Sequence, residues 1–474
     1  MSDQLWELIH QMSPSEKSSF KKQIRTGEGK EDLLYIKMFN FLNNSTEYDD
    51  RSFSREFGHG NSVSRMKNYL YELMLKVLIE LGSNSDNILR SKNYLNASWV
   101  LFQKGLYGQS RKQVEKAIDM AVTNSDLYTE SEALSLKRLI NLAELNIQGV
   151  RETIEEEGRL RELIVEVQDF ELLYYSFASF SFKKGNVVNE AERILLNELL
   201  KHPRLTSETN CRSLVARSYF HRIFTLYYAM TGDFHSMYQS AINRYNLLNE
   251  ANNAQFDTQN MINTLNNLVE ACLIINRTEE ALTYCKEIQS IKTSSMYFEA
   301  RKMIRYTILQ IQILIQTNSM DKDLDKNIDL CLDKYHRFIR PDEKLELLFL
   351  IITMHFNKRG LKEVKKWIKV YYQLSKSKTR IDLQLYIMII NIYLNYLTKD
   401  YDHMNYLIRN TERFERNEGL LDVYELKLLE ILKSEIKKSR LNHPKEDSLN
   451  ELKDNLSILP QKRNEVSMAK YIDF

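Results

Sequence analysis

The chain has 474 residues, of which 43% are hydrophobic and 27% are charged, and its formal net charge is only +2. Because one hydrophobic core rarely holds so many residues, we expect several domains or an array of repeats. The near-neutral charge excludes a general attraction to nucleic acid or to anionic membranes, and the scarcity of glycine (13) and proline (5) favours helices joined by short loops.

Residues 1–90 predict an N-terminal helical domain that serves as a cap or as an effector. The pattern indicates a helix from Pro14, a second over 31–42, a short third over 51–57 and a long amphipathic helix over 62–82. The last two, with the turn between them, match the order of a helix-turn-helix that would present Arg65, Lys67 and Asn68. However, these 90 residues carry 12 basic and 13 acidic side chains, which is a poor surface for phosphates. A nucleic-acid partner is therefore not predicted for this domain.

The sequence also predicts a cytoplasmic protein that does not enter a membrane. The first residues, MSDQLWELIHQM, lack the basic start and apolar core of a secretory signal. The two most apolar stretches, 345–356 and 383–397, are shorter than the roughly 20 residues that a spanning helix needs. The four cysteines are far apart in the sequence and are expected to be reduced, buried residues.

A break in the helical pattern recurs along the chain. In TGDFHSMYQSA (231–241) the helix stops at Gly232, and Phe234, Met237 and Ala241 then share one helical stripe. The same offsets of +2, +5 and +9 follow breaks at Gly105, Asn276, Arg359 and Lys399. We interpret each break as the joint of a helical hairpin, whose second helix packs through this stripe.

The spacing of the breaks indicates a repeat. With a further break at Gly185, successive breaks are 40 to 47 residues apart, apart from two intervals of about twice that length. These intervals predict additional joints near 318–321 and in 146–157. About eight hairpins would fill residues 91–440, and residues 441–474 would form a capping helix (451–460) and a mobile tail.

The joint and stripe resemble the second helix of the tetratricopeptide repeat, most closely in TGDF and EEALTYCKEI. The resemblance implies an all-α fold, in which hairpins stack as a right-handed α-α superhelix, or solenoid, on the N-terminal helical bundle. The chain departs from the family in its longer units and in lacking the Trp-Leu-Gly pattern of the first helix. Armadillo- or HEAT-like stacking therefore stays an alternative.

Candidate binding residues fall on the first helices of two hairpins, which in such a solenoid face the concave groove. Asn260, Asn263, Asn267 and Glu270 share one helix face, and asparagine can bind the backbone of an extended peptide. Tyr219 and Arg222 hold comparable positions in the preceding unit, and Arg222 could hold a carboxylate. A solvated polar helix face is the alternative interpretation of this row.

A basic patch lies in the stretch 358–380. Lys362, Lys366 and Lys369 share one face, and Trp367, Tyr371 and Tyr372 are interleaved with them. Charge with aromatic stacking is typical of RNA binding, although aromatic residues at these positions also form the core between helices.

No motif for catalysis, phosphate binding or metal binding was found, so the sequence predicts neither an enzyme nor a cofactor. The leading hypothesis is a non-enzymatic scaffold or adaptor that holds a partner protein or peptide in the groove. The alternatives are a peptide-responsive regulator, similar to bacterial regulators that join an N-terminal module to tetratricopeptide hairpins, and an RNA-binding repeat protein.

Overall fold

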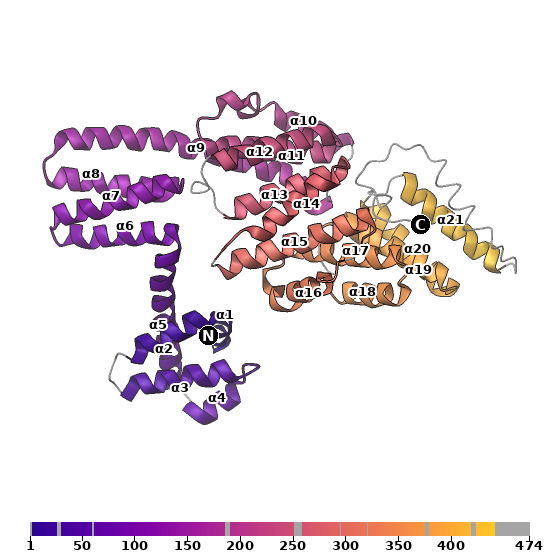
Figure 1. The fold of residues 1–474 in the computed structure, drawn as a ribbon, viewed down its shortest axis with the longest axis horizontal. Helices are drawn as coiled ribbons and strands as arrows, with labels where there is room; N and C mark the ends of the chain where they lie inside the picture. The colour runs from indigo at the N-terminus through magenta and orange to yellow at the C-terminus, as the bar shows by residue number, and fades with distance from the viewer. Residues whose placement is uncertain are drawn as a thin grey trace. The chain divides into compact units, whose positions relative to one another are not determined.

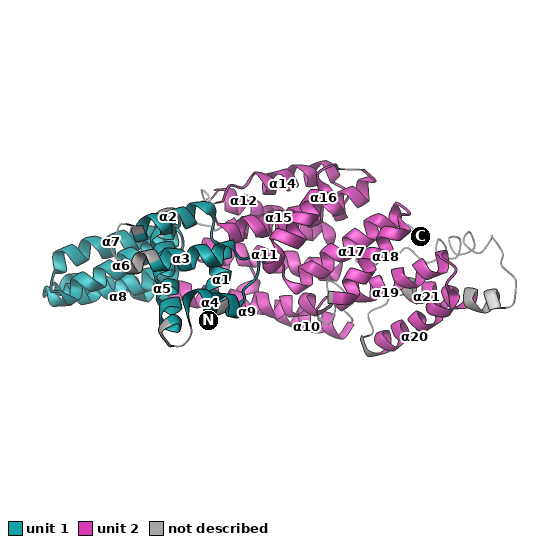
Figure 2. Cartoon of the chain, turned by 90° about the horizontal axis from the view of Figure 1, so that it is seen from below, with its two compact units in different colours: residues 1–161 teal, residues 162–474 magenta. Residues whose placement is uncertain are grey.

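The computed structural model spans residues 1–474 and describes all of them except residue 1 and the segments 26–29, 59–60, 185–189, 251–257, 294, 320, 375–378, 419–422 and 441–474. The described residues form 21 α-helices and no strand (Figure 1). The prediction of an all-α protein is therefore confirmed. The chain divides into two compact units, residues 1–161 and 162–474, and the boundary lies within one long helix (Figure 2).

The first unit contains a bundle of five helices followed by a row of antiparallel helices (Figure 1). The bundle consists of α1 (Ser2–Gln11), α2 (Pro14–Arg25), α3 (Lys30–Asn44), α4 (Asp50–Phe57) and α5 (Asn61–Ser85). The row consists of α6 (Asn87–Gln103), α7 (Tyr107–Thr123), α8 (Leu127–Ala143) and the start of α9 (Ile147–Lys184).

The bundle has its own hydrophobic core, in which Phe20, Phe39 and Leu70 are fully buried. Its helices begin where the sequence provides caps. Ser13 and Glu16 form reciprocal hydrogen bonds at the start of α2, because each side chain accepts from the other residue's backbone N–H. The four helices predicted here are confirmed.

The second unit is a row of helical hairpins in which neighbouring helices pack against each other. After the second half of α9 come α10 (Glu190–Leu200), η1 (Pro203–Leu205), η2 (Glu208–Asn210), α11 (Leu214–Thr231), α12 (Phe234–Glu250), α13 (Thr258–Ile274), α14 (Thr278–Ser290), α15 (Met296–Thr317), α16 (Leu324–Asp329), η3 (Leu330–Lys334), η4 (His336–Phe338), α17 (Pro341–Asn357), α18 (Leu361–Leu374), α19 (Ile381–Leu397), α20 (Tyr401–Glu418) and α21 (Val423–Arg440). The first helices of successive hairpins, α13, α15, α17, α19 and α21, also contact each other in order.

The joints share one backbone geometry. All five joints that carry the predicted stripe have a positive φ at the break, between 57° at Arg359 and 80° at Gly232. The same left-handed conformation occurs at three further joints, Ser125, Leu145 and Asn318. At each of the eight, the next residue's N–H donates to the carbonyl five residues earlier, over 2.8 to 3.3 Å. This is the hydrogen bond that ends a helix at a left-handed residue.

The stripe that follows the joints is buried. The +5 and +9 residues are at most 5% exposed after all five joints: Ser110, Val114, Met237, Ala241, Ala281, Cys285, Val364, Ile368, Met404 and Ile408. The prediction that these positions pack each hairpin is confirmed.

The longer intervals also contain the expected joints. Asn318 lies within the predicted 318–321, and Leu145 directly precedes the predicted 146–157. Gly185 and the predicted capping helix at 451–460 lie outside the described residues. The predicted domain boundary at residue 90 lies just after the last residues of the bundle's core. The boundary between the two compact units instead lies after residue 161.

Candidate binding face

The predicted site residues lie on the first helices of two neighbouring hairpins, α11 and α13. On α11, the Tyr219 hydroxyl donates to Glu171 of α9 over 3.1 Å. The Arg222 guanidinium lies over the Tyr174 ring, with its carbon 3.8 Å from the ring centroid. No ion pair to Arg222 occurs among the described residues, so its N–H groups are available for a carboxylate.

The asparagine row on α13 is partly exposed but not uniform. Asn263 accepts a hydrogen bond from Gln259 over 2.9 Å, and Glu270 accepts one from Asn266 over 3.0 Å. Asn260 has a structural contact, because it accepts from the buried Arg244 of α12 over 3.2 Å. Of the predicted row, Asn263, Asn267 and Glu270 therefore remain as candidates for contact with a ligand.

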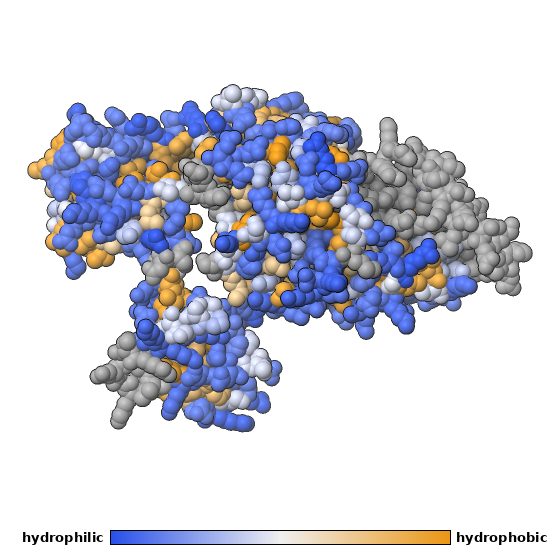
Figure 3. All heavy atoms as spheres, viewed as in Figure 1, coloured by the Kyte–Doolittle hydropathy of each residue, from blue (hydrophilic) through white to orange (hydrophobic). Residues whose placement is uncertain are grey.

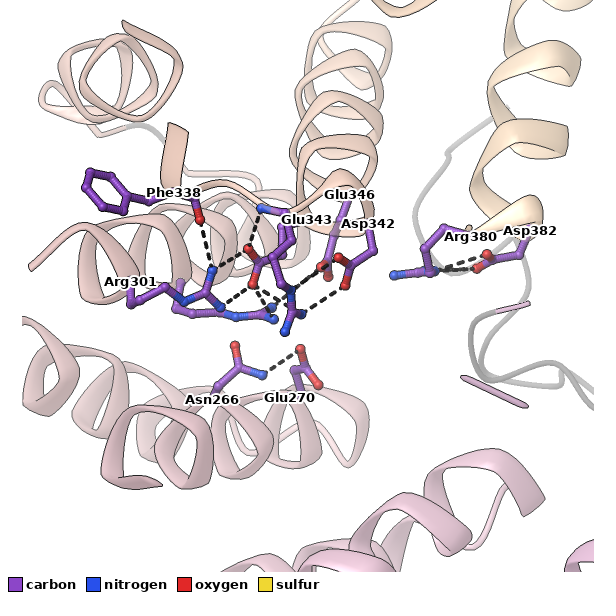
Figure 4. Close-up of polar contacts among 11 residues, drawn as sticks. Asn266, Glu270, Arg301, Phe338, Asp342, Glu343, Glu346, Arg380 and Asp382 are labelled. Carbon is purple, nitrogen blue, oxygen red and sulfur yellow. Dashed lines mark hydrogen bonds and ion pairs between the residues drawn. The ribbon is translucent and has the colours of Figure 1, made fainter. Parts of the chain in front are cut away.

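Glu270 lies beside a set of charged side chains from the following three first helices (Figure 4). We call this set, with Glu270 and Asn266, the polar cluster; its other members are Arg301, Arg305, Arg340, Asp342, Glu343, Glu346, Arg380 and Asp382. At its centre, Glu343 of α17 forms a two-pronged ion pair with Arg301 of α15. Glu343 also pairs with Arg305 over 2.8 Å and with Arg340 over 3.3 Å.

The polar cluster changes from buried to partly open across its width. The side chains of Arg301 and Glu343 are 4% and 0% exposed, whereas those of Arg305 and Glu346 are 13% and 16% exposed. Arg305 and Glu346 form a looser pair, with 3.6 Å between their nearest charged atoms. The buried pair therefore fixes the helices, and the partly exposed pair is the part that a ligand can reach.

The two glutamates of α17 have opposite pKa shifts. Burial favours the neutral form of Glu343, but attraction to Arg305, Arg301 and Arg340 outweighs burial and holds its pKa at about 2. For Glu346 burial dominates, because Arg380 and Arg305 offset it only in part and Glu270 repels its charge. The pKa of Glu346 is thereby raised to about 7, so near neutral pH it can accept or donate a hydrogen bond.

Two polar atoms of the polar cluster have no hydrogen-bond partner within the described residues. They are Nε of Arg305 and Oδ1 of Asn266, and both are buried. Asn266 is 5% exposed, and its Nδ2 already donates to Glu270. An unpaired buried donor or acceptor costs about 1 to 3 kcal/mol, which a bound polar group would recover.

The polar cluster was missed from the sequence, although a signal was present. Arg301 and Glu343 are 42 residues apart, and Arg305 and Glu346 are 41 apart, which is the repeat length itself. Opposite charges at equivalent positions of consecutive repeats indicate contacts between neighbouring first helices. The apolar character of 345–356 indicated only the core side of α17.

The basic patch is only partly assembled. Lys362, Lys366 and Lys369 on α18 are exposed, and Lys366 pairs with Glu363 over 3.5 Å. Tyr371 is 3% exposed and Trp367 packs partly against the core, so neither offers a free ring face for a base. Tyr371 and Trp367 are therefore core residues, whereas Tyr372, the third predicted aromatic, is 46% exposed.

The N-terminal bundle gives little support to a helix-turn-helix role. Lys67 is engaged within the bundle, because its ammonium lies 3.3 Å from Asp50 and 4.1 Å from the Phe53 ring centroid. Arg65 and Asn68 are exposed. Of the three predicted contacts to DNA, Lys67 instead holds α5 to α4.

No three side chains of the metal-ligating type cluster in the described part of the chain. None of the helices described is both long enough and apolar enough to cross a membrane. Compared with protein-family models, curated proteins and solved structures, the chain shows no match. The resemblance to the tetratricopeptide repeat therefore rests on the residues given above.

Proposed function

We propose that the chain is a non-enzymatic scaffold that binds an extended segment of a partner protein along the first helices of its second unit. In this proposal the hairpins stack as a tetratricopeptide-like, right-handed superhelix, and the candidate binding face lines its concave side. The regular joints, 40 to 44 residues apart from Gly232 onward, support stacking of equivalent units.

Curvature of the row is supported by one backbone contact. The N–H of Arg380, at the start of α19, donates to the carbonyl of Phe182 near the end of α9 over 3.3 Å. Packed helices lie 8 to 10 Å apart, so five steps along a straight row would separate these ends by roughly 40 to 50 Å. The contact supports a row of hairpins that bends back on itself.

One observation carries the proposal: partly exposed polar side chains continue across five consecutive first helices. They are Arg222 on α11, Asn263, Asn267 and Glu270 on α13, Arg305 on α15, Glu346 on α17 and Arg380 at the start of α19. A continuous row of donors and acceptors can bind the backbone of an extended peptide, with the charged members selecting its side chains.

The test is a selection of random 12-residue peptides on the full chain, followed by measurement of the affinity of one selected peptide by fluorescence anisotropy. We expect Asn267→Ala and Arg222→Ala each to weaken binding about tenfold, the effect of losing one or two hydrogen bonds. Asn243→Ala, on the exposed side of α12, is the matched control and should leave the affinity within about twofold. Failure to select any peptide, or equal effects of Asn243→Ala and Asn267→Ala, would contradict the proposal.

A further inference from the structure

The part of α9 that belongs to the second unit has an apolar stripe whose side chains stay largely exposed. Val165, Leu172, Tyr175 and Phe182 are 47%, 71%, 59% and 42% exposed. Their spacings of 7, 3 and 7 residues place all four on one side of the helix. We call these four residues the α9 stripe. The opposite side of the helix contributes Phe170, Leu173 and Phe177 to the core.

The repeat architecture explains why this side is open. Elsewhere in the second unit, the helices of one hairpin pack against those of the next. Here the second half of the 38-residue α9 is the first helix of the second unit, so no earlier hairpin of that unit precedes it. End repeats of such arrays need a polar outer face to stay exposed, and Leu172 and Tyr175 give this face an apolar centre.

The α9 stripe is complementary to itself in the antiparallel direction. Because the spacing 7, 3, 7 is the same in both directions, reversing the helix places Val165 opposite Phe182 and Leu172 opposite Tyr175. The flanking charges also reverse: Glu162 and Lys183 lie at opposite ends of the stripe, on the same flank, and both are exposed, while Glu162 also pairs with Arg212 of its own chain. An antiparallel pair would therefore bring Glu162 of one helix near Lys183 of the other.

We propose that the α9 stripe is the contact surface for a second copy of this chain, which docks antiparallel to the first across a two-fold axis between residues 173 and 174. A two-fold contact uses the same patch on both partners, as the symmetric spacing requires. Two helices joined over four apolar positions bury less than a standard interface, so a dissociation constant on the order of 1 to 100 μM is expected. This surface borders the candidate binding face, because Tyr175 lies 5.2 Å from the Tyr174 ring, between ring centroids, and Arg222 lies over Tyr174.

Sedimentation analysis of the full chain tests whether the surface associates. The average mass should rise toward that of a dimer as the concentration passes through the micromolar range. Leu172→Glu and Tyr175→Glu should each keep the chain monomeric, because a charge would be buried against its symmetry partner. Val100→Glu, at an exposed position of 52% on α6, is the control and should not change the association. A wild-type chain that stays monomeric, or a loss of association in Val100→Glu, would overturn the proposal.

Disulfide trapping tests the direction of pairing, and it can be read cleanly because the four native cysteines are buried and unpaired. A Val165→Cys chain mixed with a Phe182→Cys chain should form a disulfide-linked dimer under mild oxidation. Either variant alone should form little, since 17 helical residues separate the two positions by about 25 Å. Efficient linkage of Val165→Cys to itself would indicate a parallel pair and would contradict the antiparallel arrangement.

Discussion

The buried ion pair between Arg301 and Glu343 shows how a single residue can fix two neighbouring hairpins. Glu343 accepts from Arg301 and also pairs with Arg305 and Arg340, so three guanidinium groups share this carboxylate. Glu343→Gln should destabilise the second unit by about 3 to 5 kcal/mol at pH 7, because buried arginines lose their counter-charge. Urea unfolding measures this loss. Glu363→Gln, at a half-exposed ion pair on α18, is the control and should cost less than about 0.5 kcal/mol.

The pH dependence of that loss separates charge from packing. The folded pKa of Glu343 is about 2, below its ordinary value of 4.5. Its contribution is therefore present above pH 4.5 and is lost as the pH falls toward 2. Between pH 7 and pH 3 the gap in unfolding free energy between wild type and Glu343→Gln should narrow by about 2 kcal/mol. An equal gap at both pH values would show that the side chain acts through packing alone.

At the scale of one hairpin, two glycines of the α6–α7 pair should respond oppositely to the same substitution. Gly105 has a φ of 70°, whereas Gly108 lies within α7, and an added Cβ would meet no atom within 4 Å at either position. Gly105→Ala should destabilise the first unit by about 1 kcal/mol through left-handed strain. Gly108→Ala should stabilise it by about 0.5 kcal/mol through helix propensity. Thermal unfolding of both variants measures these changes in stability. Changes of the same sign would contradict the left-handed conformation assigned to Gly105.

The elements were largely predictable from the sequence because the joint and the stripe are local. The buried positions after Gly232 and Asn276 follow from the period of the helix alone. Ser125 was not predicted as a joint, because it connects two hairpins and no stripe with the same offsets follows it. The polar cluster was not predicted for a related reason. Its ion pairs join residues about 42 positions apart, whereas the period of a helix relates only residues of that helix.

The first unit exposes leucines at two of its joints. Figure 3 shows apolar side chains gathered at the end of α6–α9 where two joints lie. Leu106 and Leu145 are 41% and 79% exposed there. Leu145 is itself the left-handed residue of its joint, and Leu106 follows the left-handed Gly105. A leucine after the joint is not required by the hairpin, because Asp233 and Arg277 hold that position after Gly232 and Asn276.

At the scale of the whole molecule, the chain contains several cores, each confined to one unit. The bundle core and the α6–α8 core lie within residues 1–161, and the remaining clusters lie within residues 162–474. Packed neighbours transmit stability along a row of repeats, but separate cores need not unfold together. The sequence predicted an array of this kind, yet the long α9 was not expected, because the predicted joint within 146–157 and that at Gly185 did not indicate an unbroken helix between them.

We therefore expect calorimetry to resolve more than one thermal transition, with a calorimetric enthalpy larger than the van't Hoff enthalpy. The two substitutions above assign the transitions. Gly105→Ala should lower only the transition of the first unit, and Glu343→Gln only that of the second, because each substitution lies within one unit. If both variants lower one shared transition by amounts that scale with their free energies, the chain unfolds as a single cooperative array, and α9 must couple the two units as strongly as each core couples its own helices.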